Sequence, residues 1–215
     1  HDDMASKEDG LADRVTVDRW RRVCFSDLVI SSSLNSGDWG QSAAEITHFQ
    51  KSASSSSMSA GDTALCFRGE FEEGKLRIVK ELTVDLEAAE LGARTEYAVM
   101  PGDRAGMEIC LNLMTGQSAD RYYRIDPETE HLMSEAGEFR GKRIEIYDCW
   151  RKVKTVIEMT AEADIWVTPL DSVNRSESGY ERVHQGAAFC ISGISDDTGV
   201  FDLEISLRME VLNDT

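Results

Sequence analysis

The chain has 215 residues, of which 41% are hydrophobic, so it is long enough to bury one substantial core. Its 40 acidic and 23 Lys and Arg side chains give a formal net charge of −17 at pH 7, and that field repels nucleic-acid phosphates and anionic lipid headgroups. No apolar run approaches the roughly 20 residues that a membrane-spanning helix needs. The composition favours one globular domain and disfavours nucleic-acid and membrane partners.

The N-terminal residues 1–17 are charged and lack any periodicity, which predicts a disordered or linker tail before a single domain over residues 18–215. Because the chain starts at His1 without a Met, we expect it to be a fragment of something longer or a processed chain. Its five cysteines are widely spaced, without a C-x-x-C pair. That pattern predicts free thiols in a reducing compartment and a cytoplasmic location.

The first periodic segment runs from Asp18 to about Ile30. Trp20, Val23 and Cys24 fall at i, i+3 and i+4, which predicts one short helix. The serine-rich stretch Ser52–Asp62 that follows is typical of a flexible loop.

From Thr63 onward the hydrophobic period changes to two. Alternation runs from Leu65 to Phe71, stops at the turn sequence EEGK, and resumes at Leu76, which predicts a β-hairpin. Since many short strands alternate and no long helical pattern separates them, we expect an all-β fold of two packed antiparallel sheets with one short N-terminal helix. Further strands are expected at Met107–Leu113, Ile144–Ile146, Val153–Met159 and Phe201–Val211.

The run Asp164–Gly186, DIWVTPLDSVNRSESGYERVHQG, concentrates unusual residues. It predicts a strand at Ile165–Val167 stopped by Pro169, because proline cannot donate to a sheet ladder. A polar turn over Asn174–Gly179 follows, and a second strand is entered through Tyr180.

Catalytic motifs are absent from the sequence. The serine-hydrolase pattern G-x-S-x-G, the zinc pattern H-E-x-x-H and the dinucleotide-binding pattern G-x-G-x-x-G do not occur. The four histidines lie far apart in the chain. Glu177 and Glu181 flank one turn and could face a common site, but acids that are solvated or bonded to turn amides are the plainer interpretation. The residues therefore predict neither a catalytic site nor a metal site.

A cofactor is likewise not expected, with calcium as a weak alternative. Asp196, Asp197 and Asp202 could offer oxygens to that ion, although a hairpin loop with solvated acids is the plainer interpretation. For sugar contact, the planar side chains to consider are Trp39, Trp150, Trp166 and Tyr180, each of which is more often buried between sheets than exposed in a groove.

Three segments resemble, in the right order, the C-terminal β-sandwich domain of glycoside hydrolase family 57 enzymes, the α-amylases and 4-α-glucanotransferases. The first is Asp18–Ile30, although Leu28 follows Asp27 where the family usually has histidine. The second is Met107–Gly116, with Glu108, Asn112 and Leu113. The third and most specific is the Asp164–Gly186 run, with His184 where an aromatic residue or glutamine is more usual. Its matching residues are Ser176, Glu177, Gly179, Glu181, Gln185 and Gly186.

The resemblance implies a mutarotase-like supersandwich and an N-terminal barrel, outside this chain, that carries the catalytic glutamate and aspartate. It implies no enzyme activity for this chain alone and a parent that acts on α-glucan. The expected role is a non-catalytic accessory domain whose partners are that barrel and an α-glucan of the maltooligosaccharide or starch and glycogen type. The predicted interdomain or carbohydrate-facing motif is Trp166, Ser176, Glu177, Gly179, Tyr180, Glu181 and Gln185.

Two other functions stay open. A stand-alone carbohydrate-binding module would need exposed aromatic side chains on one sheet face. A sugar epimerase of the mutarotase type would need His131 or His184 to meet Glu177 or Glu181 in one cleft as acid and base.

Overall fold

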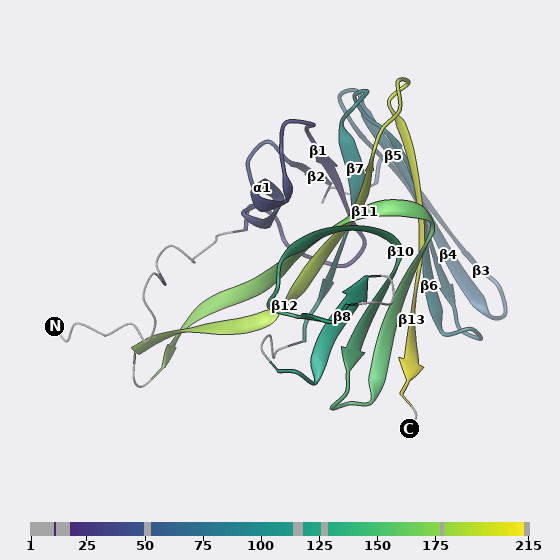
Figure 1. The fold of residues 1–215 in the computed structure, drawn as a ribbon. Helices are drawn as coiled ribbons and strands as arrows, with labels where there is room; N and C mark the ends of the chain where they lie inside the picture. The colour runs from purple at the N-terminus through teal and green to yellow at the C-terminus, as the bar shows by residue number, and fades with distance from the viewer. Residues whose placement is uncertain are drawn as a thin grey trace.

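The computed structural model describes residues 11, 18–49, 53–113, 118–125, 129–176 and 179–212. The predicted all-β fold is confirmed, since strands dominate and one short helix accompanies them (Figure 1). Of the predicted tail 1–17, the described part is Leu11, whose side chain is buried. The elements are β1 (Ser26–Ile30), α1 (Ser36–Gly40), β2 (Thr47–Phe49), β3 (Ser55–Ala60), β4 (Ala64–Glu73), β5 (Leu76–Asp85), β6 (Glu90–Ala98), β7 (Arg104–Leu111), β8 (Arg121–Ile125), β9 (His131–Leu132), β10 (Gly137–Asp148), β11 (Val153–Ser176), β12 (Gly179–Ile194) and β13 (Val200–Val211).

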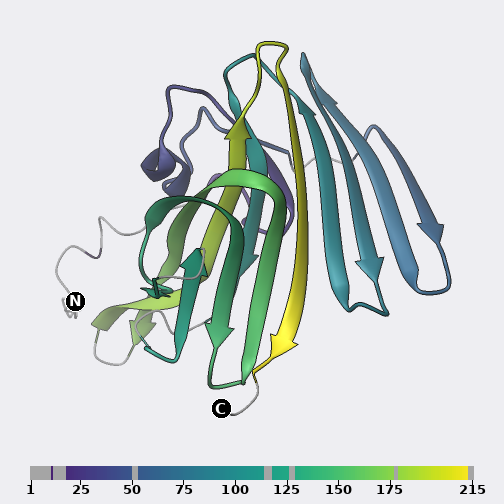
Figure 2. The same cartoon turned by 45° about the vertical axis from the view of Figure 1, so that its right-hand side comes forward.

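One long strand joins the two layers. Hydrogen bonds link the strands in the order β2-β1-β7-β12-β11-β13-β6-β5-β4-β3, with β10, β8 and β9 branching from β11. The first part of β11 pairs with β13 up to Met159, and its second part pairs with β12 from Asp164. Figures 1 and 2 show β11 arching over the molecule between these two partners. The two predicted sheets are therefore connected through β11 into one continuous antiparallel sheet that folds back on itself.

The core lies between the two layers. Ile78 and Tyr97 enter it from β5 and β6, and Ile109 and Phe189 enter it from β7 and β12, all with no solvent exposure. Strands β1 and β7 and the part of β12 over residues 186–192 are buried on both faces, because a second, smaller cluster that contains Trp39 covers their other side. Strands buried on both faces are commonly apolar, and the buried acids Asp27 and Glu108 in β1 and β7 accept hydrogen bonds from other side chains.

The N-terminal helix was predicted in the wrong place. Ser26–Ile30 is strand β1, hydrogen-bonded between β2 and β7, and the helix is α1, ten residues further along. The run LVI is β-branched at two positions and finds strand partners on both sides, so tertiary pairing overrides the helical spacing. Helix α1 instead begins at a capping box, in which Asn35 and Asp38 satisfy each other's backbone N–H groups.

The predicted serine-rich loop is also corrected. Ser55–Ala60 forms the edge strand β3, which pairs with β4 through Met58 and Phe67. All six residues of β3 are exposed, so an available sheet edge and not core burial orders this polar segment. The predicted hairpin that follows is confirmed as β4 and β5, with Gly74 at φ +63 in the turn, and the predicted last strand is confirmed as β13.

No helix among the described residues is long and apolar enough to cross a membrane.

Candidate functional site

The Asp164–Gly186 run forms a two-stranded arm. Strand β10 stops pairing with β11 at Val167, and β7 pairs with β12 only from Ala187 onward. In the described ladders, Asp171–Ser176 and Gly179–His184 therefore pair with each other and with no third strand. Figure 1 shows this arm extending from the body at the lower left, beyond the label of β12.

The prediction that Pro169 ends the strand is wrong. Strand β11 continues through Pro169, which pairs with Ala187, as far as Ser176. Proline is tolerated here because β10 pairs with β11 only as far as Val167. Beyond that residue, the side of β11 that faced β10 is a free edge, where proline costs no ladder hydrogen bond. The predicted polar turn over Asn174–Gly179 shrinks accordingly, since both strands run on to the pair Ser176 and Gly179.

A β-bulge lies at the base of the arm. Leu170 pairs with Gly186 and Asp171 pairs with His184, which leaves Gln185 as the extra residue on β12. The amide of Gln185 donates a hydrogen bond of 2.9 Å to the hydroxyl of Ser172. Bulges redirect side chains, and this one directs Gln185 into a cleft.

That cleft, of about 560 Å³, separates the base of the arm from the N-terminal segment and α1. Asp18 and Arg22 line one wall, and Asp171 and Arg182 line the other. Arg182 and Asp171 form an ion pair of 3.6 Å. The wall residues can therefore offer both charged donors and charged acceptors to a polar ligand or a polar protein surface. The full lining is Asp18, Arg22, Gly37, Gly40, Gln41, Thr168, Pro169, Leu170, Asp171, Arg182 and Gln185.

A buried ion pair supports the cleft from below. The Arg22 guanidinium donates to Glu108 Oε2 at 2.9 Å and through Nε to Asp18 at 2.8 Å, and its remaining donors reach the backbone carbonyls of Trp39 and Gly40. The Trp39 indole donates to the same oxygen of Glu108 at 3.0 Å. The side chain of Glu108 has no exposure and that of Arg22 only 4%. This cluster fixes α1 and the N-terminal segment on the β-layer.

Burial raises the pKa of Glu108, while the Arg22 charge and the Trp39 hydrogen bond oppose that shift. The pKa values of the two nearby thiols are raised as well. Burial and the Glu108 carboxylate raise the pKa of Cys110, and burial also raises the pKa of Cys24, whose thiol donates to the Cys110 carbonyl at 2.8 Å. Since the thiolate is the reactive form, these cysteines are poor nucleophiles. All five cysteines are free thiols, as predicted.

The three segments that resemble the family meet at this cluster. The pair Ser26 and Glu108 joins β1 to β7, and the Trp166 ring of the third segment packs against the Trp39 ring with 6.4 Å between centroids. Sequence reasoning named Glu108 but did not find its partner Arg22, which lies 86 residues away. The available signal was an acid within the apolar run MEICL, because a carboxylate there must find a buried partner.

The predicted motif residues fall into different environments. Trp166 is buried at the base of the arm, under the Arg104 guanidinium at 4.7 Å, whereas Tyr180 is 41% exposed on the arm. Ser176 ends β11 opposite Gly179, and Glu181 pairs with Asn174 across the arm. Glu177 lies outside the described residues. The arm thus carries Ser176, Gly179, Tyr180 and Glu181, and the cleft receives Gln185.

The histidines considered for an epimerase lie on different elements. His184 Nδ1 is 3.0 Å from Asp171 on the arm, and His131 Nδ1 is 3.3 Å from Glu135 while its ring stacks on Tyr123. The acids that the structure places beside these two rings are thus Asp171 and Glu135.

The acids considered for calcium belong to a turn. Asp196 accepts the N–H groups of Thr198 at 2.8 Å and Val200 at 3.0 Å, and the Thr198 hydroxyl and these amides lower its pKa. Within the described parts of the chain, no group of three or more His, Cys, Asp or Glu side chains could hold a metal ion.

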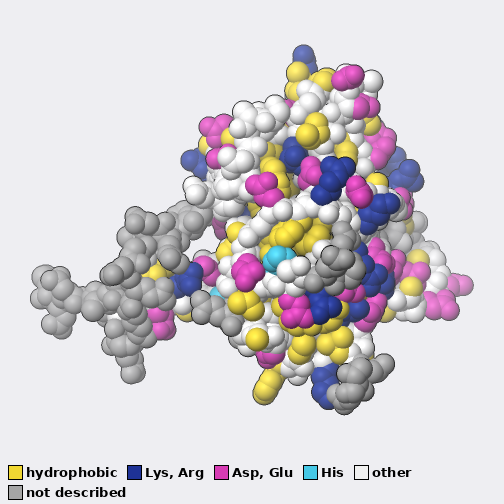
Figure 3. Space-filling model, viewed as in Figure 1, with side chains coloured by type: hydrophobic (Ala, Val, Ile, Leu, Met, Phe, Trp, Pro, Cys, Tyr) yellow, Lys and Arg dark blue, Asp and Glu magenta, His cyan; other side chains and the backbone are white. Residues whose placement is uncertain are grey.

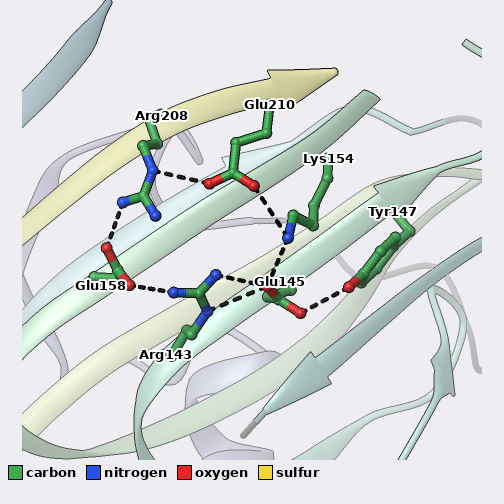
Figure 4. A network of polar contacts seen from close by, with 7 residues as sticks. All are labelled: Arg143, Glu145, Tyr147, Lys154, Glu158, Arg208 and Glu210. Atoms are coloured by element: carbon green, nitrogen blue, oxygen red, sulfur yellow. Dashed lines mark hydrogen bonds and ion pairs between the residues drawn. The ribbon is translucent and has the colours of Figure 1, made fainter. Parts of the chain in front are cut away.

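A second polar network lies across β10, β11 and β13, and each of its charged side chains forms ion pairs within the network (Figure 4). Burial raises the pKa of Glu145, but hydrogen bonds from Lys154 at 2.8 Å, Arg143 at 2.7 Å and Tyr147 at 2.7 Å outweigh this and lower it to about 2. Glu158 bridges the two arginines. Figure 3 shows the same mixture of acidic and basic side chains on this side of the molecule. Because the charges cancel within the network, we assign it a structural role. Its members are Arg143, Glu145, Tyr147, Lys154, Glu158, Arg208 and Glu210.

Near the cleft, His48 makes stability depend on pH. Its ring stacks on Trp20 at 5.1 Å, and burial, with the charges of Arg22 and Lys80, lowers its pKa from 6.5 to about 4. The unfolded chain therefore binds more protons between these values, so the free energy of unfolding rises with pH over that window. We expect a loss of about 1–3 kcal/mol as pH falls from 6.5 through 4.

Urea unfolding of the wild type and of His48→Gln at several pH values checks this expectation. The variant should lose that part of the pH dependence. An identical pH slope in the two proteins would contradict the assignment to His48.

Comparison with known proteins gives a consistent result. The model of the family described as α-amylase/4-α-glucanotransferase, C-terminal, matches residues 1–207. The α-amylase of Pyrococcus horikoshii is 32% identical over 126 residues, which are 54% of this chain and 18% of that protein. The α-amylase of Pyrococcus furiosus is 23% identical over 185 residues, 85% of this chain and 25% of that protein. The chain thus spans a quarter or less of these relatives.

A solved structure supports the same fold. The 4-α-glucanotransferase from Thermococcus litoralis superposes with a TM-score of 0.69 at 17% identity, over 95% of this chain and 30% of that one. Likeness at this identity concerns the fold alone, but the family model covers nearly the whole sequence. The chain belongs to the family of C-terminal domains of α-amylases and 4-α-glucanotransferases.

Proposed function

We propose that the chain is a non-catalytic accessory domain that packs against, and helps to shape, the catalytic unit of a longer α-glucan-acting enzyme. The observation that carries the proposal is that the family model matches residues 1–207 while the chain corresponds to only 18% and 25% of two α-amylases. In such proteins most of the polypeptide lies outside this domain. The catalytic barrel of the same polypeptide and an α-glucan are the proposed partners.

The arm supports a docking role for the predicted motif. A two-stranded ribbon is marginally stable alone in water, so contact with a second surface would stabilise it. Tyr180 is exposed on this ribbon, and an aromatic ring with a polar hydroxyl is a typical interface side chain. We propose that the arm, with Glu181 near its tip, touches the catalytic unit, and that the cleft beside Gln185 faces that unit or its glucan.

The proposed role needs neither a metal nor another cofactor, since packing and positioning involve no chemistry of their own. A cytoplasmic location is part of the proposal. The five free thiols support it, because a reducing compartment keeps thiols in that form.

The proposal predicts no turnover by the chain alone. The purified chain, incubated with maltoheptaose, should yield neither shorter nor longer oligosaccharides, because the proposal places the catalytic carboxylate pair in the unit outside this chain. Chromatography of the products checks this, with a longer polypeptide that carries the domain as the positive control. Product formation that scales with the concentration of the chain would contradict the proposal.

One observation favours a stand-alone carbohydrate-binding module as the second candidate. Trp150 is 77% exposed, and the turn that presents it is held by the Asp148 carboxylate, which accepts the Arg151 N–H at 3.0 Å. The other three tryptophans are 7% exposed or less, so Trp150 dominates any solvent-sensitive fluorescence. An exposed indole can stack on the apolar face of a glucose ring.

Fluorescence titration with maltoheptaose separates the two functions. Under the accessory proposal we expect no saturable change in the wild type at millimolar sugar, because a single indole offers too little surface to hold a glucan. A saturable shift that Trp150→Ala abolishes would favour the binding module instead.

A further inference from the structure

An apolar surface remains uncovered on the sheet formed by β3 to β6 and β13. Register places Leu65 opposite Val84, Val84 opposite Leu91, and Leu91 opposite Leu207, so one apolar row crosses four strands. The exposed fractions are large for such side chains. We call this surface the open apolar face, and its exposed members are Met58 at 77%, Leu65 at 41%, Leu86 at 65%, Leu91 at 37%, Met209 at 62% and Val211 at 75%.

The open apolar face continues the core. Ile78 and Tyr97 lie on the same side of the sheet, further along β5 and β6, and are fully buried. Leu82 and Leu207, between them and the exposed members, are partly buried against the core. Figures 1 and 2 show why the coverage ends: β3 and β4 stand at the outer edge of the sheet, away from β8 and β10. The sheet is thus wider than the layer that covers it.

The reverse face of these strands carries charged, solvent-exposed side chains. Arg68 and Glu81 are 4.0 Å apart, and Arg77 approaches Glu70 at 3.4 Å and Glu96 at 3.6 Å. Antiparallel sheets commonly have one apolar covered face and one solvated face. The strands therefore already have their solvated face, and the open apolar face is the side that requires a cover.

We propose that the open apolar face is the docking surface for the catalytic unit of the same polypeptide. This inference rests on the proposed accessory function. With strands about 4.8 Å apart and residues about 3.3 Å apart, the five strands give an apolar area of roughly 300 Å². A stable complex between separate proteins buries about 800 Å² on each partner. A tethered partner needs less, because the linker raises its effective concentration to about the millimolar range.

Charge also argues against a second copy as the occupant. Two chains that each carry −17 repel one another at moderate salt. An acidic residue, Glu87, follows Leu86 in the turn after β5, at one corner of the open apolar face. The fitting partner is thus an apolar patch with Lys and Arg at its rim, on a unit that the polypeptide itself keeps close.

Two double variants test this surface with the same strands and the same added charge. Leu86→Lys with Met209→Lys changes the open apolar face, and Thr83→Lys with Ser206→Lys changes the reverse face of β5 and β13. Because Leu86 and Met209 are largely exposed, the first pair should leave the urea midpoint of this chain unchanged. The probe is the separately expressed remainder of the longer polypeptide, titrated with each protein by calorimetry up to about millimolar concentration, the range that the tether supplies, and sedimentation velocity reports self-association.

We expect the wild type and the reverse-face variant to bind equally, and the open-face variant to bind at least tenfold more weakly. Equal binding by all three proteins would show that the open apolar face is not the docking surface. The accessory function would still hold in that case, through another contact such as the arm. Self-association of the wild type that the open-face variant abolishes would overturn it in favour of a dimer interface. A wild type that binds nothing at about millimolar concentration and stays monomeric would refute both the surface and the accessory function.

Discussion

Replacement of Glu108 by alanine is expected to lower the free energy of unfolding by about 3–5 kcal/mol, because it leaves a buried guanidinium without its main counter-charge. Arg22 would retain Asp18, but that side chain is 40% exposed and cannot enter the space that Glu108 leaves. The Trp39 indole N–H would also lose its acceptor, which adds to the cost. Domains of this size are commonly stable by only about 5–15 kcal/mol.

Urea unfolding measures this loss, and Glu108→Gln is the matched control. Glutamine keeps the shape and an oxygen for Trp39 but removes the charge, so its cost should be clearly smaller. A loss below about 1 kcal/mol in the alanine variant would show that the Arg22 cluster does not hold α1 on the β-layer.

Replacement of Gly186 by alanine is expected to cost about 3 kcal/mol or more, because the added methyl group meets backbone and not a movable side chain. A Cβ at this position would lie 2.1 Å from the Leu111 carbonyl oxygen and 2.9 Å from the Asn112 Cα. Gly186 is where β12 leaves β7 to enter the arm, so relief of the clash must move the arm or the end of β7.

Gly92→Ala is the control for this prediction. Its nearest neighbour would be the Thr83 Cβ at 3.7 Å, which is ordinary contact, so it should change stability by less than about 0.5 kcal/mol. Hydrogen exchange of Asp171–Ser176 should rise in Gly186→Ala and stay unchanged in Gly92→Ala. Equal behaviour of the two variants would contradict the close approach at Gly186.

The sequence predicts those parts of the fold that depend on local alternation. β13, in which apolar residues alternate with polar ones, and the hairpin at Gly74 follow from the period of two and from a turn residue. β1 does not, because a strand buried on both faces shows no such alternation, whereas β12 was predicted at its entry through Tyr180. Ser55–Ala60 was missed for another reason, since only the neighbouring edge of β4 makes this polar segment a strand.

The site could be predicted in its parts but not in its arrangement. Glu108 and Gln185 were both named from the sequence, but their neighbours depend on long-range register. Arg22 approaches Glu108 across 86 residues, and Gln185 reaches the cleft because of a bulge that no local pattern indicates. Pro169 misled the prediction, since its meaning depends on where β10 stops.

Glucan turnover by the longer polypeptide, with this domain intact and with it deleted, tests the central claim most directly. The proposed accessory role predicts that deletion lowers turnover of maltoheptaose or the thermal midpoint of the catalytic unit, and that the domain alone forms no product. A truncated polypeptide that keeps full turnover and an unchanged thermal midpoint would contradict it.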